Sequence, residues 1–289
     1  MEWEILDKCN LCGSGNIYYI DKKNYICRCR NCKYVFDNPR PTLKEIISFY
    51  SLDNKYNTWL DEEPQRDSLW KGRLELLIKY NRAGKLLDIG AGFGQFLFFA
   101  KEYFNIEGTE ISESAIRIAK EKYGIDVTRG ELEDICWDCK FDVITMFHIL
   151  EHVHNPKAVL MKSKKLLNSN GIMVIAVPND INSLRAIIRR ILARTNIKRF
   201  GCLGKLGIPR LSNKQDEIHI SHFTPSVLQC ALESNGFTVL NNSLDRYYVA
   251  GGLSRITQDF FYVLCLAILK IFRINLYDTI LIYARKNPD

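Results

Sequence analysis

The sequence predicts an α/β fold in which helices cover both faces of a mainly parallel sheet, preceded by a small cysteine-rich β unit. Two observations carry this prediction. From residue 85 to residue 178, apolar strand-like runs alternate with helix-like runs, a pattern typical of a parallel sheet. The first 40 residues lack this alternation and contain paired cysteines among polar and aromatic residues. A chain of 289 residues, 47% of them hydrophobic, can bury one main core and one smaller unit.

Residues 1–40 are expected to form a small zinc-binding β unit, which we call the knob. Its candidate ligands are two C-x2-C pairs with sixteen residues between them: Cys9, Cys12, Cys29 and Cys32. This spacing is typical of a tetrahedral structural zinc site, to which each pair supplies two thiolates. The alternative is four cysteines without a metal. Free cysteines are normally buried and sparse, however, and these are paired in a polar segment.

Residues 41–83 are expected to form a helical linker, and residues 84–289 the main domain. Apolar residues recur at helical spacing in the linker. In the main domain, Ser112 and Thr224 are suited to cap the helices that follow them. The expected elements are helices at 42–50 and 65–80, strand 86–89, a helix to about 104, strand 106–110, helix 112–123, strands 125–128 and 141–146, helix 156–167, strand 171–177, helix 225–233, strand 237–240, helix 257–271 and strand 279–284.

Three glycines at alternate positions connect the first strand of the main domain to its helix. Gly90, Gly92 and Gly94 follow Asp88, which lies at the strand end. Glycine omits the side chain where the backbone must approach a ligand or adopt a positive φ. The D-x-G-x-G-x-G pattern differs from the G-x-G-x-x-G pattern of dinucleotide-binding turns. Glu110 lies 22 residues after Asp88, at the end of the next expected strand, where an acid can hold ribose hydroxyls.

These residues resemble the class I S-adenosylmethionine-dependent methyltransferases. The resemblance implies a Rossmann-like seven-stranded sheet whose last strand is antiparallel, a place that residues 279–284 can fill. It also implies S-adenosylmethionine as the cofactor, bound by the glycine turn, Asp88 and Glu110. Glu131 and Leu132 follow the third expected strand, at the positions with which this family contacts adenine. For these two residues a solvated acidic loop is the alternative interpretation.

Three histidines are candidate bases that could remove a proton from the methyl acceptor. His148 follows the fourth expected strand, near the sheet edge at which ligands gather in α/β folds. A histidine that only shapes the pocket is the alternative. The run from His148 to His152 also matches the H-x-x-E-H pattern of zinc metalloproteases, but that pattern requires a helix. His219 and His222 lie in a segment similar to one in methyltransferases of sugars and other small metabolites.

The positive charge of the chain is concentrated in one segment, residues 181–215, which we call the basic insertion. The whole chain has a formal net charge of +7, and this segment contains no acidic residue. Its basic residues are Arg185, Arg189, Arg190, Arg194, Lys198, Arg199, Lys205, Arg210 and Lys214. Apolar residues alternate with the first arginines so as to give a short helix an apolar and a cationic side. We expect contact with an anionic acceptor or a membrane surface; a solvated surface helix is the alternative.

The resemblance implies methyl transfer to a small-molecule or glycan-type acceptor, anionic or lipid-linked, with zinc in a structural role. An RNA methyltransferase that holds nucleic acid with the knob and the basic insertion is the alternative enzyme class. The fourth strand ends in Thr145-Met146-Phe147-His148, however, and lacks the Asn/Asp-Pro-Pro-aromatic turn of enzymes that methylate base amino groups. Nucleic acid is therefore not the expected partner. A non-enzymatic sensor is a third alternative, although the cofactor-binding residues are intact.

We expect a cytoplasmic protein, with contact at the inner face of the membrane through the basic insertion. The first five residues lack the basic start and apolar run of a signal peptide. The longest apolar stretch, residues 260–269, is too short to cross a bilayer.

Overall fold

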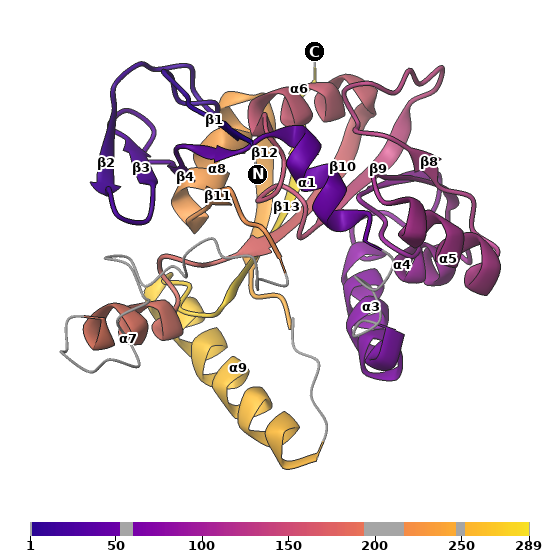
Figure 1. The fold of residues 1–289 in the computed structure, drawn as a ribbon. Helices are drawn as coiled ribbons and strands as arrows, with labels where there is room; N and C mark the ends of the chain where they lie inside the picture. Colours follow the sequence, from indigo (N-terminus) through magenta and orange to yellow (C-terminus); the bar gives the residue numbers. More distant parts are fainter. Residues whose placement is uncertain (1, 53–59, 194–216, 247–251, 289) are drawn as a thin grey trace.

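A seven-stranded sheet forms the centre of the computed structural model, which describes residues 2–52, 60–193, 217–246 and 252–288 (Figure 1). The strand order is β12-β13-β10-β9-β6-β7-β8. The strands are β6 (Lys85–Ile89), β7 (Asn105–Glu110), β8 (Thr128–Arg129), β9 (Phe141–Phe147), β10 (Leu167–Pro178), β12 (Phe237–Ser243) and β13 (Thr279–Lys286). Only β13 runs antiparallel to its neighbours, β10 and β12. The predicted Rossmann-like sheet with an antiparallel last strand is therefore confirmed.

Two of the described helices, α5 and α8, begin at the capping residues that the sequence predicts. The hydroxyl of Ser112 accepts a hydrogen bond from the N–H of Ala115 at 3.4 Å, and that of Thr224 accepts one from Val227 at 3.3 Å. Both predicted caps are confirmed. The described helices are α1 (Leu43–Tyr50), α3 (Glu63–Leu77), α4 (Gln95–Ala100), α5 (Glu113–Tyr123), α6 (Pro156–Leu166), α7 (Leu184–Leu192), α8 (Pro225–Ser234) and α9 (Gly252–Phe272).

The strand expected over residues 125–128 is shorter in the structure, where β8 comprises only Thr128–Arg129. Gly124 ends α5 with a φ of 66°, and the N–H of Ile125 donates to the carbonyl of Ala119 at 3.1 Å. A left-handed glycine of this kind satisfies the last carbonyls of a helix. Ile125, the first residue of the predicted strand, therefore forms part of the C-terminal end of α5.

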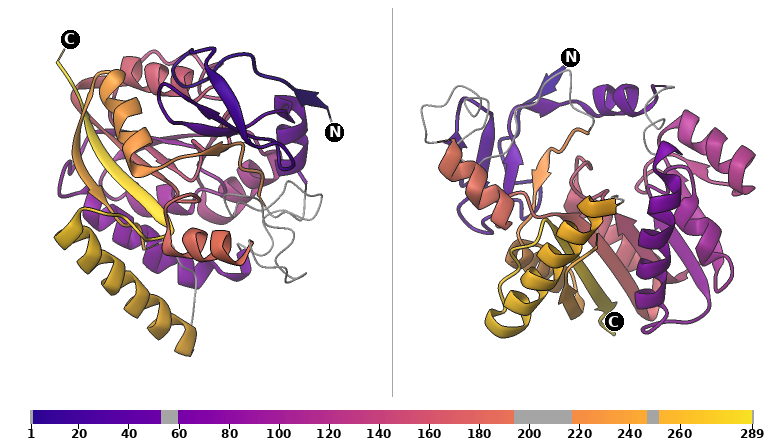
Figure 2. Two further views of the ribbon diagram at one scale, coloured as in Figure 1. Left: turned by 90° about the vertical axis from the view of Figure 1, so that its left-hand side faces the viewer. Right: turned by 90° about the horizontal axis from the view of Figure 1, so that it is seen from below.

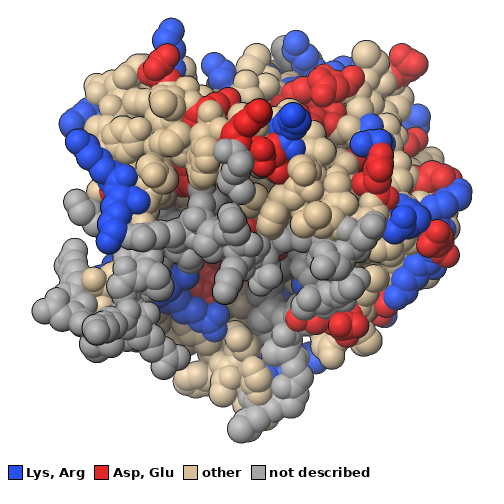
Figure 3. All heavy atoms as spheres, in the orientation of Figure 1, with Lys and Arg blue, Asp and Glu red and all other residues tan. Residues whose placement is uncertain are grey.

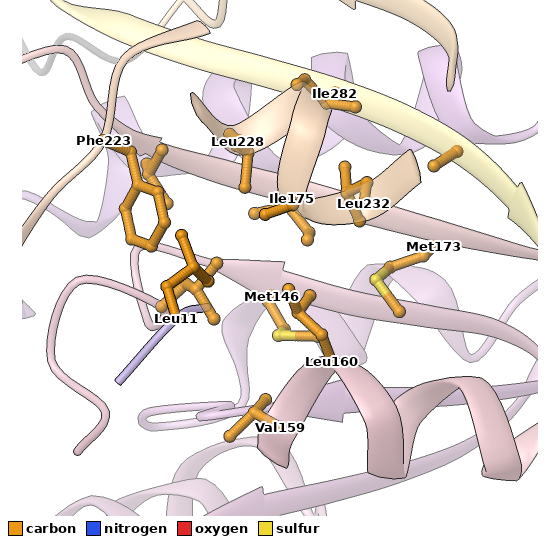
Figure 4. Close-up of a cluster of buried hydrophobic side chains, with 14 of the residues drawn as sticks. Leu11, Met146, Val159, Leu160, Met173, Ile175, Phe223, Leu228, Leu232 and Ile282 are labelled. Atoms are coloured by element: carbon orange, nitrogen blue, oxygen red, sulfur yellow. The ribbon is translucent and has the colours of Figure 1, made fainter. Parts of the chain in front are cut away.

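Side chains of the central strands alternate between two hydrophobic clusters, one on each face of the sheet. Met173 and Ile175 point to the face covered by α6 and α8, where Leu160 and Leu228 pack against them (Figure 4). The intervening residues of β10 point to the face covered by α3 and α4: Ile172, Val174 and Ala176, with Leu74, Leu77, Phe96 and Leu97 opposite. Burial on both faces explains why these strands are continuously apolar.

The knob is completed by a strand from the main domain. Its strands β2 (Ile17–Asp21), β3 (Ile26–Cys29) and β4 (Val35–Asp37) form a sheet with β11 (Ser221–His222), and β1 (Trp3–Glu4) pairs with β5 (Arg40–Pro41). Ser221 lies opposite Phe36, and His222 lies opposite Val35. Tyr34 of the knob packs on Phe223 at 5.2 Å between ring centroids. The knob and residues 221–223 therefore share a sheet and a core (Figure 2).

The basic insertion is described only as far as residue 193. The predicted short helix is present as α7, which follows β10. The remaining basic residues of the insertion lie outside the described residues: Arg194, Lys198, Arg199, Lys205, Arg210 and Lys214. Among the described helices, none is both long and apolar enough to cross a membrane.

Candidate active site

A cavity lies at the carboxyl edge of the sheet, the edge at which α/β proteins bind ligands. Its lining from the ends of the strands and the loops after them includes Asp88, Gly90, Gly92, Glu110, Glu131, Leu132, His148 and His152. Helices α1 and α3 add Tyr50, Arg66, Trp70 and Arg73, and Glu217 completes one side. The cavity thus brings together every predicted cofactor-binding residue except Gly94, and one predicted base, His148.

The glycine turn requires the absence of side chains. Gly90, Gly92 and Gly94 all have positive φ values, of 70°, 54° and 78°. A Cβ atom at Gly90 would lie 2.1 Å from Cδ1 of Ile149, so any side chain there would have to displace Ile149 and would be strained by the positive φ. Gly94 is the N-cap of α4 and contributes to the turn without lining the cavity.

The Glu110 carboxylate is fixed by backbone donors. One oxygen accepts from the N–H groups of Ile111 and Ser112 at 2.8 and 2.9 Å, and the other accepts from Gly92 at 2.9 Å. Burial raises the pKa of Glu110, while these donors oppose the rise. A carboxylate offers about four acceptor positions, so this one retains capacity for a ligand hydroxyl in the cavity.

Two further acidic groups line the cavity with raised pKa values. Burial raises the pKa of Asp88 to about 7, although its carboxylate accepts a hydrogen bond from Thr145 at 2.6 Å. Burial also raises the pKa of Glu131 to about 7, and the negative charges of Glu133 and Asp134 add to this rise. Perturbed carboxyl groups gathered in one cavity are typical of a functional site.

His148 lies between two buried carboxylates. Its Nδ1 is 3.4 Å from Glu151, and its Nε2 is 3.8 Å from Asp245. Burial opposes protonation of this ring, but the two carboxylates outweigh burial and raise the pKa of His148 above its usual 6.5. The backbone of His148 has a φ of 60°, and its N–H donates to Ala176 at 2.8 Å. The ring is therefore held at the end of β9.

A buried ion pair supports His148 from the other side of the cavity. Arg73 of α3 forms a bidentate pair with Asp245, which follows β12. The guanidinium lies 4.6 Å from the ring centroid of Trp70 and 4.5 Å from that of Phe147. Burial alone would raise the pKa of Asp245, but Arg73 and His148 lower it to about 2. Asp245 is therefore ionised and can stabilise positive charge on His148.

His219 and His222, the other two predicted bases, lie outside the cavity lining. His222 is buried between Asp37 of the knob at 3.0 Å and Asp180 at 3.2 Å, and these acids raise its pKa to about 9 against the effect of burial. His219 lies between Asp180 at 3.5 Å and Glu217 at 3.2 Å, and its pKa is raised well above 6.5 for the same reason. The flanking acids favour the protonated form of both rings. His222 links Asp37 of the knob to Asp180 of the main domain, whereas both acids beside His219 belong to the main domain.

The four knob cysteines have the geometry of a zinc site. The sulfurs of Cys9 and Cys32 lie 3.6 Å apart, as do those of Cys12 and Cys29, and all four are within 4.8 Å of one another. Two sulfurs bound tetrahedrally at 2.3 Å are about 3.8 Å apart, whereas a disulfide requires about 2.0 Å. The residues present therefore fit zinc. None of the four lines the cavity.

Glu151, His152 and His219 form a second group whose ligand atoms lie within 4.8 Å of one another. His152 and His219 already have other partners: Nδ1 of His152 lies 2.6 Å from the carbonyl oxygen of Ile218, and His219 lies beside Asp180 and Glu217. Residues 148–152 also form a turn, so the helical arrangement of a metalloprotease is not present there. Of the three residues, His152 lines the cavity, and Glu151 lies 3.4 Å from Nδ1 of His148.

The comparisons with known proteins agree with this geometry. Residues 62–242 match a family model described as a methyltransferase domain. A ubiquinone biosynthesis O-methyltransferase of Pelagibacter ubique is 30% identical over 165 residues, which cover 55% of this chain and 68% of that relative. An uncharacterised protein of Methanocaldococcus jannaschii is 34% identical over 131 residues, 45% of this chain and 60% of its own length. The chain thus spans only part of the relatives that it matches.

Solved structures show the same fold. Magnesium protoporphyrin IX methyltransferase of Synechocystis PCC 6803, with bound S-adenosylhomocysteine, has a TM-score of 0.55 at 12% identity and covers 85% of this chain and 100% of its own. An S-adenosylmethionine-dependent methyltransferase of Clostridium acetobutylicum has a TM-score of 0.52 at 12% identity, covering 81% and 99%. Sequence match, sheet order and glycine turn agree: the chain belongs to the class I S-adenosylmethionine-dependent methyltransferases.

Proposed function

We propose that this protein transfers a methyl group from S-adenosylmethionine to a small-molecule or glycan-type acceptor. One observation carries the proposal: a single cavity joins the glycine turn and Glu110 to His148. The bound cofactor supplies a sulfonium-activated methyl group. The residues of this chain supply a binding site, an orientation and a place for the acceptor's proton.

The glycine-turn side of the cavity is assigned to the cofactor. Glu110 accepts hydrogen bonds from the ribose hydroxyls, which approach over the open backbone of Gly92. Glu131 accepts a hydrogen bond from the adenine amino group, and Leu132 lies beside the ring. Asp88, held by Thr145, remains a fixed hydrogen-bonding group beneath the turn.

The His148 side of the cavity is assigned to the acceptor. The imidazole of His148 takes the acceptor's proton as the new bond to the methyl group forms, and Glu151 and Asp245 stabilise the resulting imidazolium. Relatives named O-methyltransferases support an oxygen as the methylated atom. We place this reaction in the cytoplasm, where a reducing environment keeps the knob thiols available for zinc.

The acceptor can be sought directly. Purified protein is incubated with a cell extract and with S-adenosylmethionine that carries an isotopically labelled methyl group, and mass spectrometry detects the labelled product. We expect a labelled metabolite or glycan that forms more slowly with the Glu110→Ala variant when S-adenosylmethionine is limiting. Label found only in RNA would contradict the proposed acceptor class and support the nucleic-acid alternative.

Replacing Glu110 by Ala is expected to weaken S-adenosylmethionine binding by about tenfold or more. Hydrogen bonds to a charged group contribute roughly 1.5–3 kcal/mol, and about 1.4 kcal/mol corresponds to a factor of ten in affinity. Isothermal titration calorimetry measures the loss. Glu107→Ala is the matched control, because Glu107 lies on the same strand with an exposed side chain. Equal affinity in the two variants would remove Glu110 from the cofactor site.

A further inference from the structure

Helix α9 carries an exposed apolar stripe along its whole length. Its inner side packs through Cys265 and Leu269 against Tyr277. The opposite side is exposed at successive helical turns, with Ile256 at 65%, Phe260 at 72% and Ile271 at 70% of full exposure. Val263, Leu264 and Ala267 lie between them and are also exposed. Side chains at this spacing lie on one side of a helix, so α9 presents a continuous apolar surface to solvent.

Helix α7 extends the same surface. Arg185 of α7 donates to Gln258 of α9 at 3.0 Å, and its guanidinium lies 5.1 Å from the ring centroid of Phe261. The two helices are therefore held together, as Figure 1 shows. Ile188 and Ile191 of α7 are 46% and 59% exposed. We call the exposed sides of α7 and α9 the docking face.

Positive charge predominates next to the apolar residues of the docking face. The cations on and next to these helices are Arg185, Arg189, Arg190, Arg255, Lys270 and Arg273. Asp259 is the single acidic residue within α7 and α9, and it lies 3.9 Å from Arg255. Asp278, which precedes β13, pairs with Arg185 at 2.8 Å, so the other cations outnumber the acids. In Figure 3 the described atoms at the foot of the molecule, where Figure 1 places α9, are mainly tan and so belong to residues without a formal charge, while both signs of charge are visible above.

The docking face lies at the same sheet edge as the cavity. Helix α7 follows the carboxyl end of β10, and α9 connects the carboxyl end of β12 to β13. Since β12 and β10 are both antiparallel to β13, their carboxyl ends lie at one edge. Asp245, which reaches His148 in the cavity, immediately precedes the segment that leads to α9. A surface bound by α9 therefore lies near the proposed acceptor site.

We propose that α7 and α9 dock this protein onto an anionic lipid bilayer, with the apolar stripe in the interface and the cations at the lipid phosphates. Interfacial helices combine these two features, and each cation near an anionic surface adds to the attraction. A second copy of the chain is a less suitable partner for the docking face, because two such faces would bring their positive charges together. In placing the acceptor at a membrane, this inference rests on the proposed function.

Vesicle sedimentation tests the docking. The full chain is mixed with vesicles of phosphatidylcholine alone or of phosphatidylcholine with one-third phosphatidylglycerol. We expect binding to the anionic vesicles that weakens with salt. Phe260→Asp combined with Ile271→Asp should reduce this binding at least about tenfold, since both side chains lose their apolar burial. Lys270→Ala combined with Arg273→Ala should weaken binding to anionic vesicles only.

The control variant combines Ile5→Asp with Tyr103→Asp, which removes exposed apolar residues outside the docking face and should bind like the wild type. Unchanged vesicle binding by the Phe260/Ile271 variant would overturn the proposal. The proposal would also be overturned if the wild type did not bind anionic vesicles but formed a dimer that the Phe260/Ile271 variant could not form. Calorimetry with S-adenosylmethionine separates the docking proposal from the proposed methyltransferase function. The docking variants should keep full cofactor affinity even where vesicle binding is lost.

Discussion

Replacing His148 by Asn is expected to lower kcat by about 10²- to 10⁴-fold, the usual contribution of a positioned base. S-adenosylmethionine affinity should stay nearly unchanged, because Glu110 and the glycine turn are untouched. Asn suits this site, since His148 has a φ of 60° and Asn tolerates the left-handed region. Steady-state kinetics with the acceptor identified above, together with calorimetry of cofactor binding, measures both quantities.

The pH dependence of the wild type gives a second readout of the same residue. A base must be neutral to accept a proton, and the carboxylates of Glu151 and Asp245 raise the pKa of His148 above 6.5. The value of kcat/KM should therefore fall as the pH falls through this raised pKa, and the dependence should disappear in the Asn variant. His154→Asn is the control, because His154 lies outside the cavity lining. Wild-type turnover in the His148 variant would mean that this ring is not the base.

The geometry favours one of the three histidines that the sequence offers as candidate bases, namely His148. His219 and His222 are each flanked by two acids, and their raised pKa values keep them protonated at neutral pH. A protonated ring cannot accept the acceptor's proton. Substitution of His222 should therefore loosen the contact between the knob and the main domain, whereas substitution of His219 should disturb its contacts with Asp180 and Glu217.

Local patterns in the sequence are sufficient to predict the cofactor side of the cavity. Gly90 and Glu110 lie in short segments whose spacing alone indicates a turn and an adjacent strand end. Thr224 is recognisable as a helix cap for the same reason, because its partner lies three residues away. Each of these contacts joins residues that are close in the chain or occupy equivalent places on neighbouring strands.

The acceptor side depends on contacts that no local pattern reveals. Arg73 and Asp245 are 172 residues apart, and nothing in either segment identifies the other as its partner. One signal was available: Arg73 shares the buried side of α3 with Leu69 and Leu77, and a charge on an apolar helix side implies a buried partner. Tyr50, Glu151 and Glu217 were likewise absent from the predicted site residues. Strand β11 is too short to be predicted, and its pairing with β4 depends on the whole fold.

Loss of zinc from the knob is expected to have the largest effect on stability. Four cysteine thiolates bind zinc with an apparent free energy on the order of 10–16 kcal/mol, which is comparable to the total stability of a domain. The freshly purified protein should contain close to one zinc ion per chain. Cys29→Ser should lose most of this metal, because Cys29 is fully buried and its sulfur lies 3.6 Å from that of Cys12 within the four-cysteine cluster. Elemental analysis and thermal unfolding measure the two effects.

The loss of stability should extend beyond the knob to the residues of the main domain that contact it. Strand β11 pairs with β4, His222 bonds to Asp37, and the N–H groups of Ile220 and Ser221 donate to the carbonyl of Glu151 beside His148. Hydrogen exchange should therefore accelerate over residues 26–37 and 218–222 in Cys29→Ser, while β9 and β10 keep their protection. Cys230→Ser changes an exposed cysteine outside the cluster and should behave like the wild type. A wild-type protein without zinc, or a Cys29 variant with undiminished protection of β11, would show that the knob holds its shape without a metal.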